Sequence, residues 1–256
     1  GRRRELDELV RALGLARQSR GQVVGIVGEA GVGKSRLCSE FLRVGAADTL
    51  VLESAALSHG QPHAFLPLIE MLWRYFAIEA HDGEETRREK ICRRILALDP
   101  GLEDRLPYLL ALLGVSDATS DLLQMEPELR RARTMDVVKA VLLRESLIQP
   151  VLLVFEDLHW LDGESLAFLE ALVESLPEAR LLVIMTYRPE YQHRWGGKSC
   201  YVQVRLDPLR PDEARELLAG LVAGAATLRQ LIASRAQGNP FFIEEMVQAL
   251  VDRGVL

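Results

Sequence analysis

The stretch that decides the fold is Gly28-Glu29-Ala30-Gly31-Val32-Gly33-Lys34-Ser35, which follows the pattern G-x-x-x-x-G-K-[ST]. Before it, residues 23–27 form a short apolar run rich in β-branched side chains, which predicts a strand. After it, Leu37 and Phe41 resume helical spacing. The order strand, glycine-rich turn and helix is the context in which this pattern forms a phosphate-binding loop.

Such a loop binds phosphate mainly through its backbone. The glycines allow N–H groups between Gly28 and Arg36 to surround phosphate oxygens, and the helix N-terminus adds partial positive charge. We expect Lys34 to reach the β- and γ-phosphates of a nucleotide and Ser35 to place its hydroxyl on Mg²⁺. A structural glycine turn that binds nothing is the alternative interpretation.

A pair of acids follows a second apolar strand. The run Val151–Phe155 leads directly into Glu156-Asp157, which resembles a Walker B motif. Mg²⁺ prefers oxygen ligands, and hydrolysis needs a group that orients or deprotonates water. Glu156 is therefore a candidate Mg²⁺ ligand together with Ser35, and Glu156 and Asp157 are candidate catalytic residues; a solvated strand end is the alternative. The usual order is Asp before Asp or Glu, so the reversed order here predicts slow hydrolysis.

The pattern of apolar residues predicts an α/β fold with a parallel five-stranded sheet. Strands are expected at 23–27, 50–52, 151–155, 181–185 and 201–206, with helices between them. The interval 57–149 is far longer than a crossover needs, and its apolar residues recur at helical spacing, which predicts a helical insert between the second and third strands. We assign residues 1–207 to a P-loop NTPase core and 208–256, where only helical patterns remain, to a small and incomplete helical lid.

Composition narrows the function classes. The 256 residues correspond to roughly 1.7 domains of average size, and a net charge of −6 argues against direct nucleic-acid binding by this segment. The longest strongly apolar runs are five residues, too short to span a membrane. Cys38, Cys92 and Cys200 form no C-x-x-C pair, so we expect neither zinc nor disulfides, and a cytoplasmic setting. The chain starts without Met, and we expect an excised fragment that lacks flanking effector or sensor domains.

Five segments together resemble the STAND-type P-loop ATPases, a regulatory branch related to AAA+ proteins. The segments are Gly1-Arg2-Arg3-Arg4-Glu5-Leu6, the phosphate loop, residues 155–162, Thr186-Tyr187-Arg188-Pro189-Glu190, and Gly238-Asn239-Pro240-Phe241-Phe242-Ile243-Glu244-Glu245. The resemblance is to modules of bacterial multidomain signalling proteins that carry cyclase, LuxR-type or protein kinase domains.

The resemblance implies roles for three more residues. Arg2 is expected beside the adenine, Arg188 near the γ-phosphate as a catalytic residue, and Pro240 against the adenine from the lid. It also implies ATP or ADP with Mg²⁺, a slowly hydrolysing regulatory switch, and as partners other domains of the same polypeptide or a nucleotide-dependent homo-oligomer. We expect His159 and Trp160 to form a packed aromatic pair, and Trp195 to lie in a mobile loop.

Two other functions remain open. A non-hydrolysing nucleotide-binding scaffold would fit the reversed acidic pair. A small-molecule phosphotransferase could use the insert as an acceptor lid, with residues 130–133 binding a second anion. A nucleic-acid motor is disfavoured by the acidic balance.

Overall fold

A parallel sheet of five strands forms the centre of the protein. The computed structural model describes residues 2–45, 47–55, 64–115, 122, 124–222 and 226–253. The strands are β1 (Gln22–Val27), β2 (Leu50–Ala55), β3 (Val151–Glu156), β4 (Leu181–Tyr187) and β5 (Tyr201–Arg205). Their order is β2-β3-β4-β1-β5, with every neighbouring pair parallel. The expected α/β fold with a parallel five-stranded sheet is therefore confirmed.

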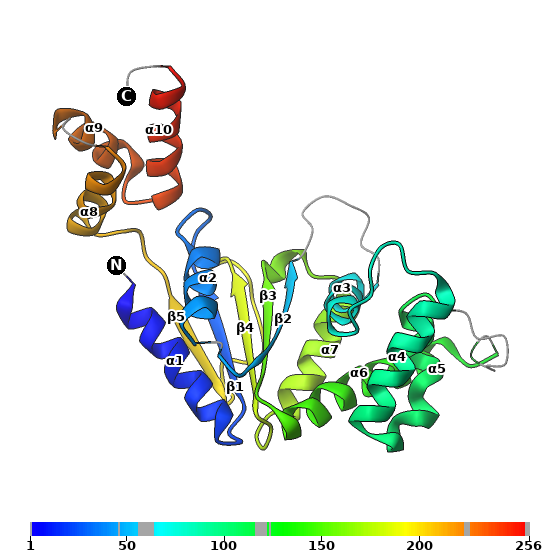
Figure 1. Ribbon diagram of the computed structural model, residues 1–256. Coiled ribbons are helices and arrows are strands. Elements are labelled where there is room, and N and C mark those ends of the chain that lie inside the picture. The colour runs from blue at the N-terminus through cyan, green and yellow to red at the C-terminus, as the bar shows by residue number, and fades with distance from the viewer. Residues whose placement is uncertain are drawn as a thin grey trace.

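Helices cover both faces of this sheet (Figure 1). On one face lie α1 (Arg3–Arg17) and α2 (Lys34–Gly45), which share a core cluster with alternate residues of the strands, such as Val24 and Ile184. The other face packs against α7 (Gly163–Glu174) and part of the helical insert. Because strand side chains alternate between faces, strands buried on both sides read as the continuous apolar runs seen in the sequence.

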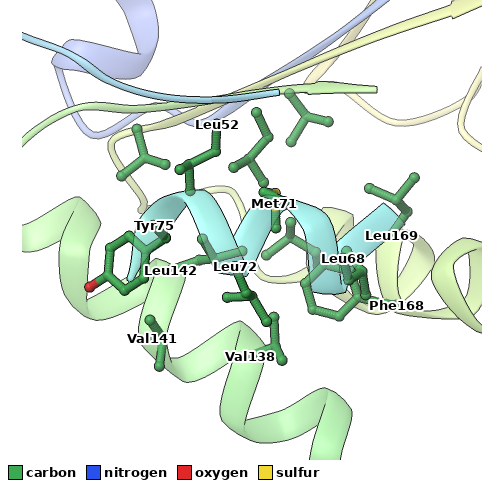
Figure 2. Close-up of a cluster of buried hydrophobic side chains, with 14 of the residues drawn as sticks. Leu52, Leu68, Met71, Leu72, Tyr75, Val138, Val141, Leu142, Phe168 and Leu169 are labelled. Carbon is green, nitrogen blue, oxygen red and sulfur yellow. The ribbon is translucent and has the colours of Figure 1, made fainter. Parts of the chain in front are cut away.

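The expected helical insert between β2 and β3 is present. Its described elements are α3 (Leu66–Tyr75), α4 (Glu84–Leu98), the 3₁₀ helix η1 (Pro100–Arg105), α5 (Leu106–Leu112) and α6 (Pro127–Ile148). Figure 2 shows α3 between the sheet and α6, with Leu68, Met71 and Leu72 completely buried. The insert thus shares one continuous apolar core with the sheet and does not form a separate unit.

Three C-terminal helices pack around a small core of their own. They are α8 (Pro211–Leu221), α9 (Ala226–Ala236) and α10 (Pro240–Asp252), and their shared cluster includes Leu218, Ile232 and Ile243. Figure 1 places them beyond the carboxyl end of the sheet, on the side of α1 and α2. We call α8–α10 the lid helices.

The segment between β4 and β5 differs from the expected mobile loop. Trp195 is 2% exposed, and the ring of His193 stacks on it with centroids 5.4 Å apart. The Nε2 atom of His193 lies 3.0 Å from the hydroxyls of both Tyr187 and Tyr201, which also hydrogen-bond to each other. These hydroxyls sit over Gly25 of β1, where a Cβ atom would come within 2.4 Å of the Tyr201 hydroxyl. The segment is a packed cover on the sheet.

Within the part of the chain that the structure describes, no helix has the length and apolar character to cross a membrane.

Candidate functional site

The phosphate loop connects β1 to α2 at the carboxyl end of the central strand. Gly31 and Gly33 have φ angles of +77° and +101°, in the left-handed region that favours glycine. The first helical hydrogen bond runs from the Leu37 N–H to the Gly33 carbonyl at 3.0 Å, so the preceding N–H groups of the helix start are not used within α2. A Cβ atom on Gly33 would meet nothing within 4 Å, so the space beside these groups is open. An open cradle of N–H groups at a helix N-terminus fits an anion such as phosphate.

Lys34 supplies a buried positive charge to this cradle. Its side chain is 8% exposed, and its Nζ donates to the carbonyls of Gly28 at 2.9 Å and Glu29 at 3.1 Å. Burial lowers the pKa of the Lys34 ammonium, while the charge of Asp157 acts in the opposite direction. Among the described residues, no carboxylate lies within ion-pair distance of Lys34. A buried cation without a carboxylate partner is suited to bind an anionic ligand.

The structure brings Ser35 and Glu156 into direct contact. The Ser35 hydroxyl, in the first turn of α2, donates to Glu156 Oε2 at the end of β3. The side chains of Ser35 and Glu156 therefore place two oxygen atoms beside the phosphate loop. Oxygen atoms are the ligands that Mg²⁺ prefers. The pair fits a magnesium ion shared with phosphate oxygens. The charge of Glu156 also helps burial to raise the pKa of the neighbouring Cys38 thiol to about 12.

Asp157 follows in a less common backbone conformation. Its φ and ψ are 53° and 58°, and its N–H donates to the Thr186 hydroxyl of β4 at 2.9 Å. Because β4 lies between β1 and β3, this bond ties the acidic turn to the strand next to the phosphate loop. The negative charge of Asp157 raises the pKa of both Lys34 and His159, against the effect of burial.

His159 and Trp160 contact each other, with ring centroids 5.1 Å apart, as expected of an aromatic pair. Trp160 is nevertheless 48% exposed, so the pair is packed on one side only. Both ring nitrogens of His159 are buried and have no hydrogen-bond partner among the described residues. Burial lowers the pKa of His159, which favours the neutral ring.

Arg188 lies directly after β4 and is the least constrained of the predicted catalytic residues. Its side chain is 40% exposed, with Glu190 at 4.0 Å. The positive charge of Arg188 acts on Lys34 and on His159, so it belongs to the same group of charges. A guanidinium has the charge and the geometry to bind phosphoryl oxygens.

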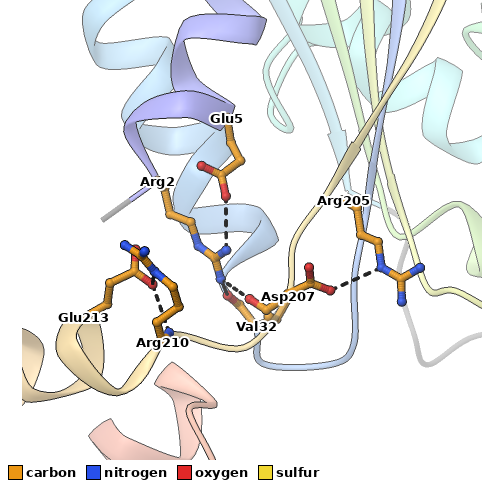
Figure 3. Close-up of polar contacts among 7 residues, drawn as sticks. All are labelled: Arg2, Glu5, Val32, Arg205, Asp207, Arg210 and Glu213. Atoms are coloured by element: carbon orange, nitrogen blue, oxygen red, sulfur yellow. Dashed lines mark hydrogen bonds and ion pairs between the residues drawn. The ribbon is translucent and has the colours of Figure 1, made fainter.

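The Arg2 side chain connects three parts of the chain beside the phosphate loop (Figure 3). Its guanidinium contacts Glu5 at 3.2 Å, the Val32 carbonyl at 3.4 Å and the Asp207 carbonyl at 2.5 Å. It thereby links the start of α1 to the phosphate loop and to the segment that leads into α8. Sequence reasoning placed Arg2 beside a base but did not anticipate these two carbonyl contacts.

A cavity of about 570 Å³ lies between the core and the lid helices. Apolar side chains and carboxylates from α1, α2, α8 and α10 line it. The lining includes Arg2, Val32 and Arg36 beside the phosphate loop and Leu209 and Pro240 on the lid side. The Arg36 side chain is 78% exposed and faces Glu244 of α10 at 3.4 Å, so it stands at the rim. The structure thus places Arg2 and Pro240, predicted from distant parts of the sequence, around one cavity next to the loop.

The start of α10 touches the phosphate loop itself. Asn239 Nδ2 donates to the Ala30 carbonyl at 3.0 Å, and the Phe241 N–H donates to the Gly31 carbonyl at 3.2 Å. Asn239 and Thr186 occur in the segments quoted for the family resemblance, but no role in the site was expected for either of them. The available signals were Asn239 between Gly238 and Pro240, and a threonine at the end of an otherwise apolar strand.

Comparisons with known proteins agree with this geometry. Residues 1–184 match the family model described as the AAA ATPase domain. An uncharacterized protein of Rhizobium meliloti (strain 1021) is 27% identical over 241 residues; the match covers 89% of this chain and 22% of the relative. The chain therefore spans about a fifth of that protein's length.

The comparison with solved structures finds similarities at low sequence identity. A chain in the structure of Drosophila ORC bound to DNA is 13% identical, with a TM-score of 0.52 over 100% of this chain and 57% of that one. A STAND protein with a tetratricopeptide repeat sensor from Pyrococcus horikoshii is 17% identical, with a TM-score of 0.45 over 90% of this chain and 28% of that one. Cdc6p from Pyrobaculum aerophilum is 12% identical, with a TM-score of 0.48 over 85% of this chain and 48% of that one.

Proposed function

This chain belongs to the AAA ATPase domain family, and we propose that it is an ATP-binding, slowly hydrolysing regulatory switch of the STAND type. In this proposal, residues 1–207 form the Mg²⁺-dependent ATPase core and 208–256 a lid. The ATP or ADP state would control the arrangement of the lid, and through it other domains of the same polypeptide or a homo-oligomer. The five quoted motifs and the family match support this assignment.

The buried ammonium of Lys34 is the observation that carries the proposal. It lies in an open cradle of N–H groups, and among the residues that the structure describes it bonds only the carbonyl oxygens of Gly28 and Glu29. Desolvation of a charge is costly unless a partner compensates for it, and two neutral carbonyls compensate only in part. A nucleotide triphosphate would supply the missing negative charge at the point where Lys34 and the helix N-terminus converge.

We assign Ser35 and Glu156 to a Mg²⁺ site. Both oxygens lie beside the phosphate loop and already contact each other. The ion, when bound, neutralises charge on the phosphate oxygens. Ser35 and Glu156 would hold it at the end of β3, and the backbone of residues 28–36 would hold the phosphates themselves.

Asp157 and Arg188 are our candidates for the hydrolytic step. The Asp157 carboxylate would orient the attacking water, and the Arg188 guanidinium would stabilise negative charge on the transferring phosphoryl group. The acidic turn is fixed through the Thr186 hydroxyl, whereas the Arg188 side chain is 40% exposed. An aspartate that is one methylene shorter than glutamate, with an exposed arginine, supports slow turnover.

The cavity between the core and the lid helices is our candidate adenine site. Its volume of about 570 Å³ exceeds what a purine needs, and Arg2 and Pro240 lie on its walls. Phosphate-loop contacts do not distinguish bases, so any preference for ATP over GTP would arise here. We propose ATP on the strength of the family.

The structure affects the two alternative functions, a non-hydrolysing scaffold and a phosphotransferase, differently. The reversed acidic pair still fits a scaffold that binds nucleotide without hydrolysis. A phosphotransferase that uses residues 130–133 for a second anion is less favoured, because Arg131 faces Glu164 at 3.1 Å and Arg130 donates to the Leu122 carbonyl at 3.4 Å.

Calorimetric titration of nucleotide-free protein with ATP, ADP and GTP in the presence of Mg²⁺ tests the proposal. We expect one adenine nucleotide per chain and slow phosphate release that requires no added acceptor. Binding without phosphate release would favour the scaffold, and acceptor-dependent ADP formation would favour the phosphotransferase. A folded, nucleotide-free protein that binds none of the three would contradict the proposal.

A further inference from the structure

Three consecutive carbonyls of the phosphate loop accept hydrogen bonds from outside the loop. Ala30 is bonded by Asn239 Nδ2 at 3.0 Å, Gly31 by the Phe241 N–H at 3.2 Å, and Val32 by Arg2 at 3.4 Å. Two of the three donors are the N-cap residue of α10 and a residue of its first turn. The lid helices therefore make their contact with the core at the very segment that we assign to phosphate.

One side chain performs two tasks at this contact. Asn239 Oδ1 accepts the Phe241 N–H at 3.1 Å and so caps α10, while its Nδ2 donates to the Ala30 carbonyl. Asparagine is among the preferred N-cap residues, but serine and aspartate cap equally well and lack the amide donor. The contact with Ala30 is thus a property that capping alone does not require.

The approach of α10 to the loop is as close as a glycine allows. A Cβ atom on Gly31 would lie 2.8 Å from Asn239 Oδ1 and 2.8 Å from the Phe241 Cβ. Gly31 also has a φ of +77°. Two features therefore favour glycine at position 31: the left-handed backbone conformation and the close approach of the lid helices.

Fixing a carbonyl also fixes the N–H of the same peptide. The peptide unit is planar and trans, so the C=O of Ala30 and the N–H of Gly31 point in opposite directions. Because the Ala30 carbonyl is held toward the lid helices, the Gly31 N–H points away from them. The same holds for the Val32 carbonyl, held by Arg2, and the Gly33 N–H.

We infer that Asn239 is a positioning residue for the phosphate loop. Through the Ala30 carbonyl it holds the Gly31 N–H in the orientation that binds phosphate, without touching the nucleotide. Coupling between two binding events is reciprocal, so phosphate in the loop holds the lid helices on the core. This inference rests on the proposed nucleotide site and names the contact through which that site communicates with the lid.

The variant Asn239→Ser tests this role, because serine keeps the cap and removes the amide donor. One hydrogen bond of this kind corresponds to about a threefold to tenfold loss in affinity. We expect that loss for Mg²⁺–ATP and, by the same factor, for Mg²⁺–tripolyphosphate measured by competition. The matched control is Gln248→Ser on the same helix, which removes an amide that bonds Asp252 at 2.8 Å and leaves the loop untouched.

A second readout separates positioning from a merely structural role. Saturating Mg²⁺–ATP should slow hydrogen exchange of the Phe241 amide in the wild type and not in Asn239→Ser. A structural role would lower the thermal stability of the variant while the folded protein kept its affinity.

The outcomes distinguish this inference from the proposed function. If the wild type binds ATP and Asn239→Ser binds it equally well, the inference is wrong and the nucleotide site stands. If affinity for ATP falls and affinity for tripolyphosphate does not, Asn239 acts on the base side, which also overturns the inference. If the wild type binds neither ligand, the proposed function fails.

Discussion

Replacing Lys34 by methionine should abolish tight nucleotide binding and leave the fold intact. Methionine keeps an unbranched side chain of similar length in a site that is 8% exposed, and it removes the charge. A hydrogen bond to a charged group contributes about 1.5–3 kcal/mol. Binding exchanges the two carbonyl partners of Lys34 for phosphate oxygens, so we expect a net loss of about 3 kcal/mol, which is about 150-fold in Kd.

The assay is calorimetric titration with Mg²⁺–ATP, with Lys198→Met as the matched control. Lys198 lies 3.8 Å from Glu174 in an exposed ion pair remote from the loop, and its replacement changes the net charge by the same amount. We expect the control to bind within about twofold of the wild type, since such surface pairs contribute little. Equal affinities of Lys34→Met and Lys198→Met would refute the reasoning that places phosphate at Lys34.

Four further predictions concern individual residues. Glu156→Gln removes the charged oxygen that faces Ser35, so steady phosphate release should fall by about tenfold or more while ATP still binds, and unchanged release would remove Glu156 from the metal site. Gly25→Ala places a Cβ atom 2.4 Å from a tyrosine hydroxyl and should cost about 1–3 kcal/mol of unfolding free energy in denaturant titration. Gly163→Ala, with open space around it in a helical first turn, should instead stabilise by about 0.4–1 kcal/mol. Burial lowers the pKa of His193, so the stability it contributes is present above about pH 6.5 and lost as the pH falls through its folded value. Between pH 7.5 and 5.5 the Tm of the wild type should therefore drop more than that of His193→Gln, and parallel curves would contradict this.

Much of the fold could be predicted from the sequence because its signals are local. The phosphate-loop pattern, the apolar runs and the helical spacing each lie within a short window, and all five strands occur where they were expected. Pro127 and Pro240 stand in the first turns of α6 and α10, where a missing N–H costs nothing. The strand order β2-β3-β4-β1-β5, in contrast, was not predicted, because it depends on pairing between strands that lie far apart in the sequence.

The site was predictable where each of its residues belonged to a recognised motif. Ser35 and Glu156 were expected near each other, since both were assigned to one Mg²⁺ site, and the structure brings their side chains into contact. The bond from Asn239 to Ala30 was not expected, because the two residues are 209 positions apart and an asparagine before the first residue of a helix is common as a cap. Trp195 was assigned to a mobile loop because two glycines follow it, whereas tertiary packing against His193 and the sheet determines its position.

Hydrogen exchange of the wild-type protein in three states tests the switch most directly. Amides of the phosphate loop and of the first turn of α10 would be compared in the nucleotide-free, Mg²⁺–ADP and Mg²⁺–ATP forms. A ligand shifts an equilibrium only through its differential affinity for the two states. The switch predicts that ATP protects both segments more strongly than ADP does. Equal protection by ATP and ADP, or protection of the loop alone, would contradict it.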